Sequence, residues 1–248
     1  MRSYGIIGYP LDHSFSQQYF TEKFRSLGLD DHQYLNFPIS RIEELPAIIA
    51  GQSHLMGLNI TIPYKKQVVP FLTDRSNIPA GMNACNCISI ENGKTIGYNT
   101  DIIGFERSLK SAWKNKDIKA LLLGSGGAAE AVCFVLKSLA IDYVIVGREK
   151  SYENKLTYAD LDEQLIKTHL LIINTTPVGT YPDINDCPRL PYSYLTTNHL
   201  LYDLVYNPAK TMFLQKGEER GAAIQNGYEM LVLQAEESWR IWTSERGK

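Results

Sequence analysis

The sequence has little that would mark a secreted, membrane-bound or nucleic-acid-binding protein. Its four cysteines show no paired zinc-binding spacing, and only Cys85 and Cys87 lie close together. No apolar run approaches the length of a transmembrane helix, and the first residues lack an apolar segment that ends in a small-residue cleavage site. No basic run stands out. These absences predict a cytoplasmic protein with reduced cysteines, no metal site, and neither a membrane nor a nucleic acid as partner.

The composition is that of an ordinary globular protein. Apolar residues make up 44% of the chain and charged residues 21%, and 25 basic residues nearly balance 27 acidic ones. A single core stops growing near roughly 250 residues. The 248 residues therefore suit either one large domain or two of ordinary size, and we expect two.

Strand and helix patterns alternate through the first hundred residues, with strands expected at 4–9 and 32–39, a helix at 41–50 and a third strand ending at 59–63. This alternation predicts a sheet with parallel pairs. Because proline suits the first turn of a helix, Pro63 predicts that Tyr64 and Lys65 open a helix at the end of the third strand. Asn92-Gly93, between two short strands, predicts a hairpin turn.

The second half restarts with an apolar strand at 119–123, a glycine-rich turn and a helix, followed by further strands at 143–147, 170–174 and 200–204. The fold class expected is α/β. We expect an N-terminal α/β domain over residues 1–100 and a C-terminal doubly wound, Rossmann-type nucleotide-binding domain over 101–227. A last amphipathic helix, within 228–248, is expected to pack back on the first domain.

The glycine-rich turn carries the clearest cofactor signal. Gly124, Gly126 and Gly127 lie between a buried strand and a helix, where a pyrophosphate can approach backbone N–H groups. Its spacing departs from G-x-G-x-x-G, so a glycine turn without cofactor is the alternative. At the end of the next strand Arg148 stands where NAD-selective sites place an acidic residue, which favours the 2′-phosphate of NADP. The neighbouring Glu149 opposes that preference.

Lys65 and Asp101 are the candidate catalytic pair. Lys65 follows the polar residues Asn59 and Thr61, and Asp101 lies at the junction with the second domain. A lysine and an aspartate that meet in an interdomain cleft can hold a substrate hydroxyl and move its proton while a nicotinamide takes the hydride. Each residue alone also fits a simpler role, a solvated lysine and a helix cap.

The chain resembles the shikimate dehydrogenase family over almost its entire length. The matching blocks follow one another in the family's order and spacing: Gly8–Pro10, His13–Ser16, Asn59–Lys65, Asn83–Asn86, Gly97–Asp101, the glycine turn, Asn174–Gly179, Asp203–Pro208 and Gly227–Leu231 with Gln234. Each block alone is weak. Together they are highly specific.

The resemblance implies reversible, NADPH-dependent reduction of 3-dehydroshikimate to shikimate in chorismate and aromatic amino acid biosynthesis, with Lys65 as proton donor beside Asp101. It implies that Ser14 and Ser16, helped by Tyr206, hold the substrate carboxylate. The ring hydroxyls would contact Asn59, Thr61, Asn86, Asp101 and Gln234. The cofactor would contact Gly124, Ser125, Gly126, Gly127, Ala128, Arg148, Thr175 and Gly227.

Two departures from the family pattern leave alternatives open. The chain has Gly147-Arg148-Glu149 where the family often has Asn-Arg-Thr, and Asn86-Cys87 where it usually has Asn-Thr. The alternatives are a quinate/shikimate dehydrogenase with relaxed or NAD cofactor use, and a catalytically silent small-molecule-binding protein. Retention of both Lys65 and Asp101 argues against a silent binder. The state expected in solution is a monomer or a homodimer.

Overall fold

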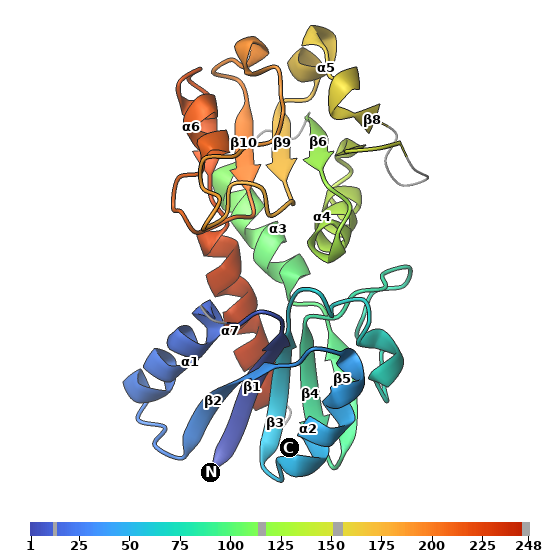
Figure 1. The fold of residues 1–248 in the computed structure, drawn as a ribbon, viewed down its shortest axis with the longest axis vertical. Coiled ribbons are helices and arrows are strands. Elements are labelled where there is room, and N and C mark those ends of the chain that lie inside the picture. Colours follow the sequence, from blue (N-terminus) through green and yellow to red (C-terminus); the bar gives the residue numbers. More distant parts are fainter. Residues whose placement is uncertain (12–13, 114–117, 151–155, 245–248) are drawn as a thin grey trace. The chain divides into compact units, whose positions relative to one another are not determined.

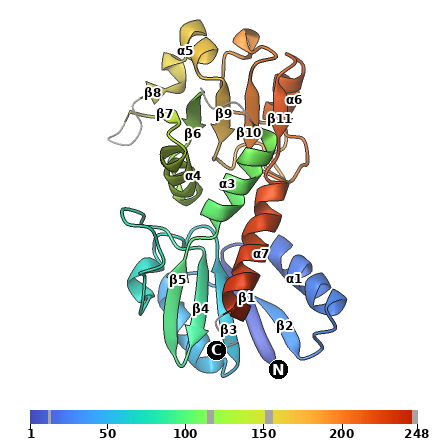
Figure 2. The same ribbon diagram turned by 180° about the vertical axis from the view of Figure 1, so that it is seen from behind.

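The chain forms two compact units, each built on its own sheet (Figures 1 and 2). The structure is a computed structural model that describes residues 1–11, 14–113, 118–150 and 156–244. The first unit comprises Met1–Thr100 and Ala235–Lys248, and the second comprises Asp101–Gln234. Within the part of the chain that is described, no helix is both long enough and apolar enough to cross a bilayer.

The first unit contains a mixed five-stranded sheet in the order β2-β1-β3-β4-β5. Its strands are β1 (Arg2–Gly8), β2 (His32–Pro38), β3 (Leu55–Ile60), β4 (Cys87–Glu91) and β5 (Lys94–Tyr98). β1 runs parallel to β2 and β3, which confirms the predicted parallel pairs, while β3, β4 and β5 are antiparallel neighbours. The hairpin prediction is also confirmed, because Asn92 and Gly93 between β4 and β5 both have positive φ, 49° and 78°.

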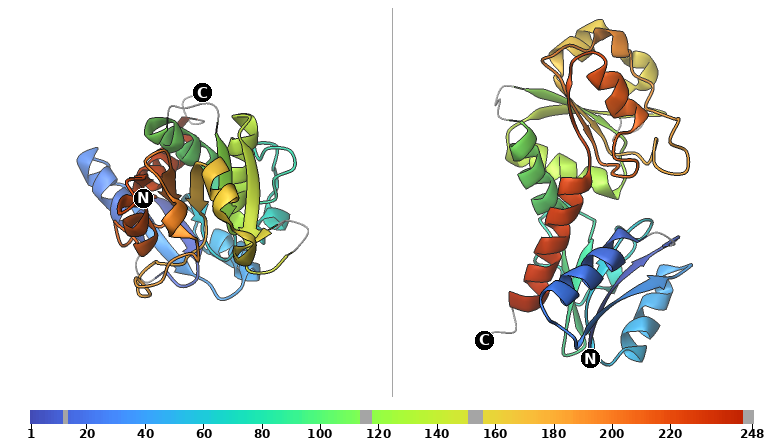
Figure 3. Two further views of the ribbon diagram at one scale, coloured as in Figure 1. Left: turned by 90° about the horizontal axis from the view of Figure 1, so that it is seen from above. Right: turned by 90° about the vertical axis from the view of Figure 1, so that its left-hand side faces the viewer.

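Helical segments cover both faces of this sheet. They are α1 (Phe15–Ser26), η1 (Ile42–Glu44), α2 (Leu45–Gly51), η2 (Val69–Phe71) and the end of α7 (Tyr228–Ser244). Ile7 of β1 packs in one cluster with Leu45 of α2, whereas Ile6 packs in another with Phe20 of α1 and Trp242 of α7. Figure 3 (right) accordingly shows α1 and α2 on opposite sides of the sheet. The alternation of side chains along each strand thus separates two apolar layers.

The two neighbouring cysteines fall into these different layers. Cys85 is buried in the α2 layer and Cys87 in the α1 layer, and both are free thiols. Within this segment the Cys85 thiol donates to the Cys87 backbone oxygen at 3.2 Å.

The predicted helix after Pro63 is wrong. Residues 62–68 form successive turns that lead into η2. The backbone oxygen of Lys65 accepts a hydrogen bond from the Cys85 N–H at 2.8 Å, while the Val69 N–H turns back to Lys66. The Lys65 oxygen is satisfied by the Cys85 N–H from a neighbouring loop, and the helical hydrogen bond from Val69 to Lys65 is not made.

The second unit contains a fully parallel six-stranded sheet in the order β11-β10-β9-β6-β7-β8. The strands are β6 (Lys119–Leu123), β7 (Asp142–Gly147), β8 (Leu156–Thr157), β9 (Leu171–Asn174), β10 (Leu200–Asp203) and β11 (Ala223–Gln225). Strand order reverses between β6 and β9, which places the topological switch point at their carboxyl ends.

Helices again cover both faces, as a fully parallel sheet requires. They are α3 (Asp101–Ala112), α4 (Gly127–Ser138), η3 (Tyr158–Asp160), α5 (Glu163–Thr168), η4 (Tyr192–Tyr194) and α6 (Met212–Glu218). On one face the ring of Phe105 in α3 lies 5.2 Å from that of Tyr202 in β10. On the other, Ile166 of α5 and Phe213 of α6 pack against Leu201. The predicted doubly wound α/β fold is confirmed.

A buried carboxylate joins the ends of β9 and β10. Asp203, the last residue of β10, accepts hydrogen bonds from Asn174 Nδ2 (2.9 Å), the Val205 backbone N–H (3.0 Å) and Thr211 Oγ1 (2.6 Å). Burial raises the pKa of Asp203 to about 6, although the three donors act to lower it. Asp203 therefore ties two strand ends to Thr211, the N-cap of α6.

Trp242 holds the end of α7 on the first sheet. Its side chain is 1% exposed, and its indole N–H donates to the Ile88 backbone oxygen at 3.0 Å. A Cβ on Gly57 would lie 2.2 Å from the indole nitrogen, so the glycine in β3 makes room for this ring.

Trp242→Ala is expected to lower the free energy of unfolding by about 3–5 kcal/mol, because it leaves a cavity and removes the hydrogen bond to Ile88. Urea unfolding measures this loss. The exposed neighbour Thr243 provides the control, since Thr243→Ala should change stability by less than about 0.5 kcal/mol. Equal effects of the two substitutions would contradict the anchoring role of Trp242.

Asp203 should make the protein less stable as pH rises through about 6. Its folded pKa lies above the ordinary value of 3.8, so its stabilisation is complete below that value and is lost as pH passes about 6. A difference of about two units corresponds to roughly 3 kcal/mol. Urea unfolding between about pH 4 and 7 should show the stability difference between wild type and Asp203→Asn shrinking by up to this amount. A pH-independent difference would refute the shift.

Candidate active site

The polar residues predicted for the substrate gather at one edge of the first sheet. Thr61 directly follows β3, and its backbone N–H donates to the Ile7 oxygen of β1 at 2.9 Å. Asn59 lies at the end of β3 and pairs in register with Cys87, the residue after Asn86. Ser14 and Ser16 lie at the start of α1, the helix that follows β1. Parallel and antiparallel pairing thus bring five predicted residues to the same edge.

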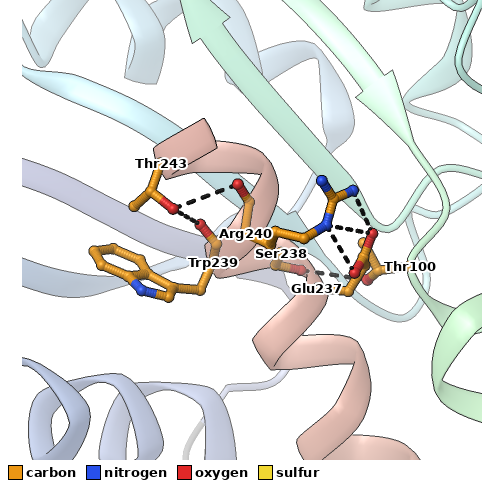
Figure 4. A network of polar contacts seen from close by, with 6 residues as sticks. All are labelled: Thr100, Glu237, Ser238, Trp239, Arg240 and Thr243. Atoms are coloured by element: carbon orange, nitrogen blue, oxygen red, sulfur yellow. Dashed lines mark hydrogen bonds and ion pairs between the residues drawn. The ribbon is translucent and has the colours of Figure 1, made fainter. Parts of the chain in front are cut away.

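Asn59 and Asn86 belong to a buried polar network. Asn59 Nδ2 lies 3.3 Å from the Asn86 backbone oxygen and 2.9 Å from Ser238 Oγ of α7. Asn86 Oδ1 accepts from the Thr100 N–H at 2.7 Å, and Asn86 Nδ2 donates to Thr100 Oγ1 at 3.0 Å. Ser238 and Thr100 close the network, with their hydroxyl oxygens 3.3 Å apart (Figure 4). The side chains of both asparagines are therefore held in fixed orientations.

In the same helix, Glu237 and Arg240 form an ion pair at 2.6 Å, and Figure 4 shows Glu237 beside Thr100. The Arg240 side chain is largely exposed. Glu237 is buried, so the pair is exposed only at its Arg240 end, and neither residue is among those predicted for the site.

Lys65 is half-buried on the turn after β3. The hydrogen bond from Cys85 to the Lys65 backbone oxygen fixes this turn beside Asn86, the residue that follows Cys85. The first unit thus brings Lys65 to the edge that carries Asn59 and Asn86. Asp101 opens α3 in the second unit, where it is 5% exposed.

Ser14 caps α1 through a 3.4 Å hydrogen bond from the Gln17 N–H to its Oγ. Accepting this bond leaves the Ser14 hydroxyl proton available for another acceptor. Ser16 is buried in the first turn of the same helix. His13, which belongs to the same sequence block, lies outside the described residues.

Gln234 and Asp101 lie on one face of the α3–α7 contact in the second unit. A Cβ on Gly104 would lie 3.1 Å from Gln234 Cβ and 2.7 Å from the Met230 oxygen, so the glycine lets the helices touch. Asp101 precedes Gly104 by three residues, which places both on the same side of α3. The side chain of Gln234 donates to the Leu231 oxygen at 2.9 Å.

The glycine turn lies at the carboxyl end of β6, at the switch point of the second sheet. Gly124 has φ +102° and contacts Thr175 and Thr176, so both backbone and packing demand glycine. A Cβ on Gly126, by contrast, would meet no protein atom within 4 Å. Gly126 is the N-cap of α4, where glycine is favoured, and the open space beside it also allows close approach of a pyrophosphate. Ser125, Gly127 and Ala128 complete the turn and the start of α4 and are partly exposed.

The other residues predicted for the cofactor and carboxylate follow neighbouring strands of the second unit. Thr175, after β9, donates from its hydroxyl to the Leu123 oxygen of β6 at 2.7 Å, which locks the switch point. Gly227 permits a close approach to Leu204, whose oxygen would lie 2.1 Å from an added Cβ. Tyr206 is half-buried after β10, and burial raises its pKa.

Arg148 follows β7 and is exposed. Its positive charge acts on Tyr158, where it lowers a pKa that burial raises. Lys150, two residues on, is instead engaged with Asp160 at 3.3 Å. The structure therefore leaves Arg148 at the strand end where the ribose of a dinucleotide binds in this fold.

Sequence reasoning missed Tyr34, Ser238 and Thr100 as members of the site. Tyr34 of β2 donates to Asn59 Oδ1 at 2.8 Å. Thr100 lies within the matching block Gly97–Asp101 but was given no role in the site, and no motif or spacing connects Tyr34 or Ser238 to Asn59. Among the residues the structure describes, no three His, Cys, Asp or Glu side chains gather into a group that could hold a metal ion.

Comparison with known proteins gives concordant matches. The family model described as "Shikimate dehydrogenase substrate binding domain" matches residues 6–88. The chain is 38% identical to the shikimate dehydrogenase (NADP(+)) of Methanococcus maripaludis strain C7, over 96% of this chain and 90% of that protein.

Solved structures extend the likeness to both units. A shikimate 5-dehydrogenase of Thermus thermophilus in complex with NADP(H) and shikimate is similar with TM-score 0.86 and 28% identity, over 98% of this chain and 94% of that one. A shikimate 5-dehydrogenase of Listeria monocytogenes in complex with shikimate and NAD is similar with TM-score 0.86 and 27% identity, over 98% and 92%. With sequence, fold and site arrangement in agreement, the chain belongs to the shikimate dehydrogenase family.

Proposed function

We propose that this protein is an NADP-dependent shikimate dehydrogenase, which reversibly reduces 3-dehydroshikimate to shikimate. The observation that carries the proposal is the arrangement of the first unit's sheet edge. There the Lys65 turn is bonded to the loop of Asn86, and Asn86 is bonded to Asn59. The family model for substrate binding covers this region.

The first unit would bind the substrate. Ser14 has a hydroxyl proton to donate to the carboxylate, and Ser16 lies two residues away in the same helix start. Tyr206 would assist from the second unit. Asn59, Thr61, Asn86 and Gln234 would contact ring hydroxyls, and a substrate that lacked one of these hydroxyls would leave a buried polar group unpaired.

Lys65 and Asp101 would carry out the proton transfer. In reduction, the Lys65 ammonium would donate a proton to the carbonyl oxygen as that oxygen gains negative charge. The Asp101 carboxylate would accept a hydrogen bond from the hydroxyl that forms on this oxygen and so orient it. When bound, the nicotinamide cofactor supplies the hydride.

The second unit would bind the cofactor. The N–H groups at the start of α4, reached through Gly126, suit the pyrophosphate, and Thr175 and Gly227 shape the neighbouring loops. Arg148 suits the 2′-phosphate of NADP. Glu149 directly beside Arg148 supports NAD as a second candidate cofactor, which the Listeria relative contains in its structure.

We also propose that the protein is cytoplasmic and acts as a monomer or homodimer. The thiols of Cys85 and Cys87 are buried in different apolar layers and are not joined in a disulfide, which supports a reducing compartment.

The test is absorbance-monitored oxidation of shikimate by the purified protein, run with NADP and with NAD, and repeated with quinate. Reduction of NADP by shikimate in preference to the other pairs is the expected result. Faster reaction with quinate or NAD would redirect the specificity. No reaction with any combination of substrate and cofactor would overturn the proposed activity and favour a catalytically silent small-molecule-binding protein.

Lys65→Ala should lower kcat by about 10²–10⁴-fold while changing the KM for shikimate little, because proton transfer acts in the transition state. Steady-state kinetics with shikimate and NADP measures both constants. Lys66→Ala provides the matched control, since it removes the neighbouring ammonium from the same turn. An unchanged kcat in Lys65→Ala would remove the lysine from the mechanism.

Arg148→Ala should raise the KM for NADP by about 10–100-fold, the effect of losing a charge-assisted hydrogen bond to the 2′-phosphate. The KM for NAD, which lacks that phosphate, should stay within about twofold of the wild-type value. A parallel rise for both cofactors would show that Arg148 acts on something other than the 2′-phosphate.

A further inference from the structure

The side-chain amide of Asn59 is almost fully occupied by the protein itself. It is 5% exposed; Nδ2 lies 2.9 Å from Ser238 Oγ and 3.3 Å from the Asn86 backbone oxygen, and Oδ1 lies 2.8 Å from Tyr34 Oη. A backbone carbonyl can only accept, so the NH₂ group must face Asn86 and Ser238. Both amide hydrogens are then engaged, and Oδ1 retains one lone pair for a further donor.

Tyr34 fixes the opposite end of this amide. Its side chain is 4% exposed on β2, and burial raises its pKa well above the ordinary value, so the phenol stays protonated. Because Oδ1 only accepts, the phenol donates its proton to it. The Ser16 side chain lies near enough to the same phenol to lower its pKa, against the larger effect of burial. The phenol therefore bonds one residue assigned to the substrate, Asn59, and lies near a second, Ser16.

We propose that Tyr34 is a positioning residue for substrate selection, which holds Asn59 as an acceptor for one ring hydroxyl of shikimate. The inference rests on the proposed function. With no N–H left to donate, Asn59 would recognise a hydroxyl at that ring position and reject a group that cannot donate a hydrogen bond.

Without the phenol, Asn59 loses one of the three contacts that orient it. Its Oδ1 is then no longer held in one position, so it would accept less well from the substrate hydroxyl. The loss should therefore concern one hydroxyl of the substrate and leave the others unaffected.

The test compares wild type and Tyr34→Phe with shikimate, 4-deoxyshikimate and 5-deoxyshikimate. For shikimate the KM should rise about five- to tenfold with kcat within about twofold, as expected when a hydrogen bond common to ground and transition states is lost. For the analogue without the hydroxyl that Asn59 accepts, the two proteins should have equal KM, since the interaction is already absent. Shikimate-induced shifts of the melting temperature provide a second readout.

Two controls separate positioning from general damage. Tyr202→Phe removes another buried phenol, bonded at 2.8 Å to Ser108 in the second unit, and should leave the KM for shikimate unchanged. If Tyr34→Phe does not fold, Ser238→Ala loosens the amide from its other end and should give the same hydroxyl-selective rise.

An equal rise in KM for all three substrates would show that Tyr34 has only a structural role, which contradicts the proposal. No rise in KM with shikimate would also overturn it. An inactive wild-type protein would instead reject the proposed function. The two failures are thus distinguishable.

Discussion

Satisfaction of buried hydrogen-bonding groups is the constraint on which the first unit depends. Asn59, Asn86, Thr100 and Ser238 are all less than 9% exposed, and each is bonded to another member of the set. A buried polar group without a partner costs about 1–3 kcal/mol, so each of these four residues depends on the others to satisfy its hydrogen bonds. The same requirement that stabilises the fold therefore orients the groups that would meet a substrate.

The second unit meets a different constraint, the close approach of backbones. Gly104 lets α3 touch α7, Gly227 lets the chain pass Leu204, and Gly124 contacts the loop after β9. Asp203 then ties the ends of β9 and β10 with three hydrogen bonds. The strand ends at the switch point are thereby fixed before any ligand binds, which suits a site that must accept an extended dinucleotide.

Much of the fold could be predicted from the sequence because local patterns determine it. Apolar strands, the glycine turn after Leu123 and the Asn92-Gly93 turn all act over a few residues. The helix predicted after Pro63 does not form, and there the Lys65 oxygen accepts a hydrogen bond from the distant Cys85 N–H instead. The contacts of Asn59 to Tyr34 and Ser238 span 25 and 179 residues, so no local pattern contains them. The resemblance supplied the substrate residues, whereas the network that holds them came only from the structure.

The open space beside Gly126 separates two kinds of glycine in one turn. Gly124 is constrained by its own backbone and neighbours, whereas a methyl group at 126 would touch nothing in the protein. Backbone angle and packing therefore require glycine at position 124, whereas neither requires it at position 126. In a lineage that ceased to use a dinucleotide, position 126 would drift to other residues while position 124 stayed glycine. The residue at position 126 would thus indicate whether a descendant chain still binds a dinucleotide.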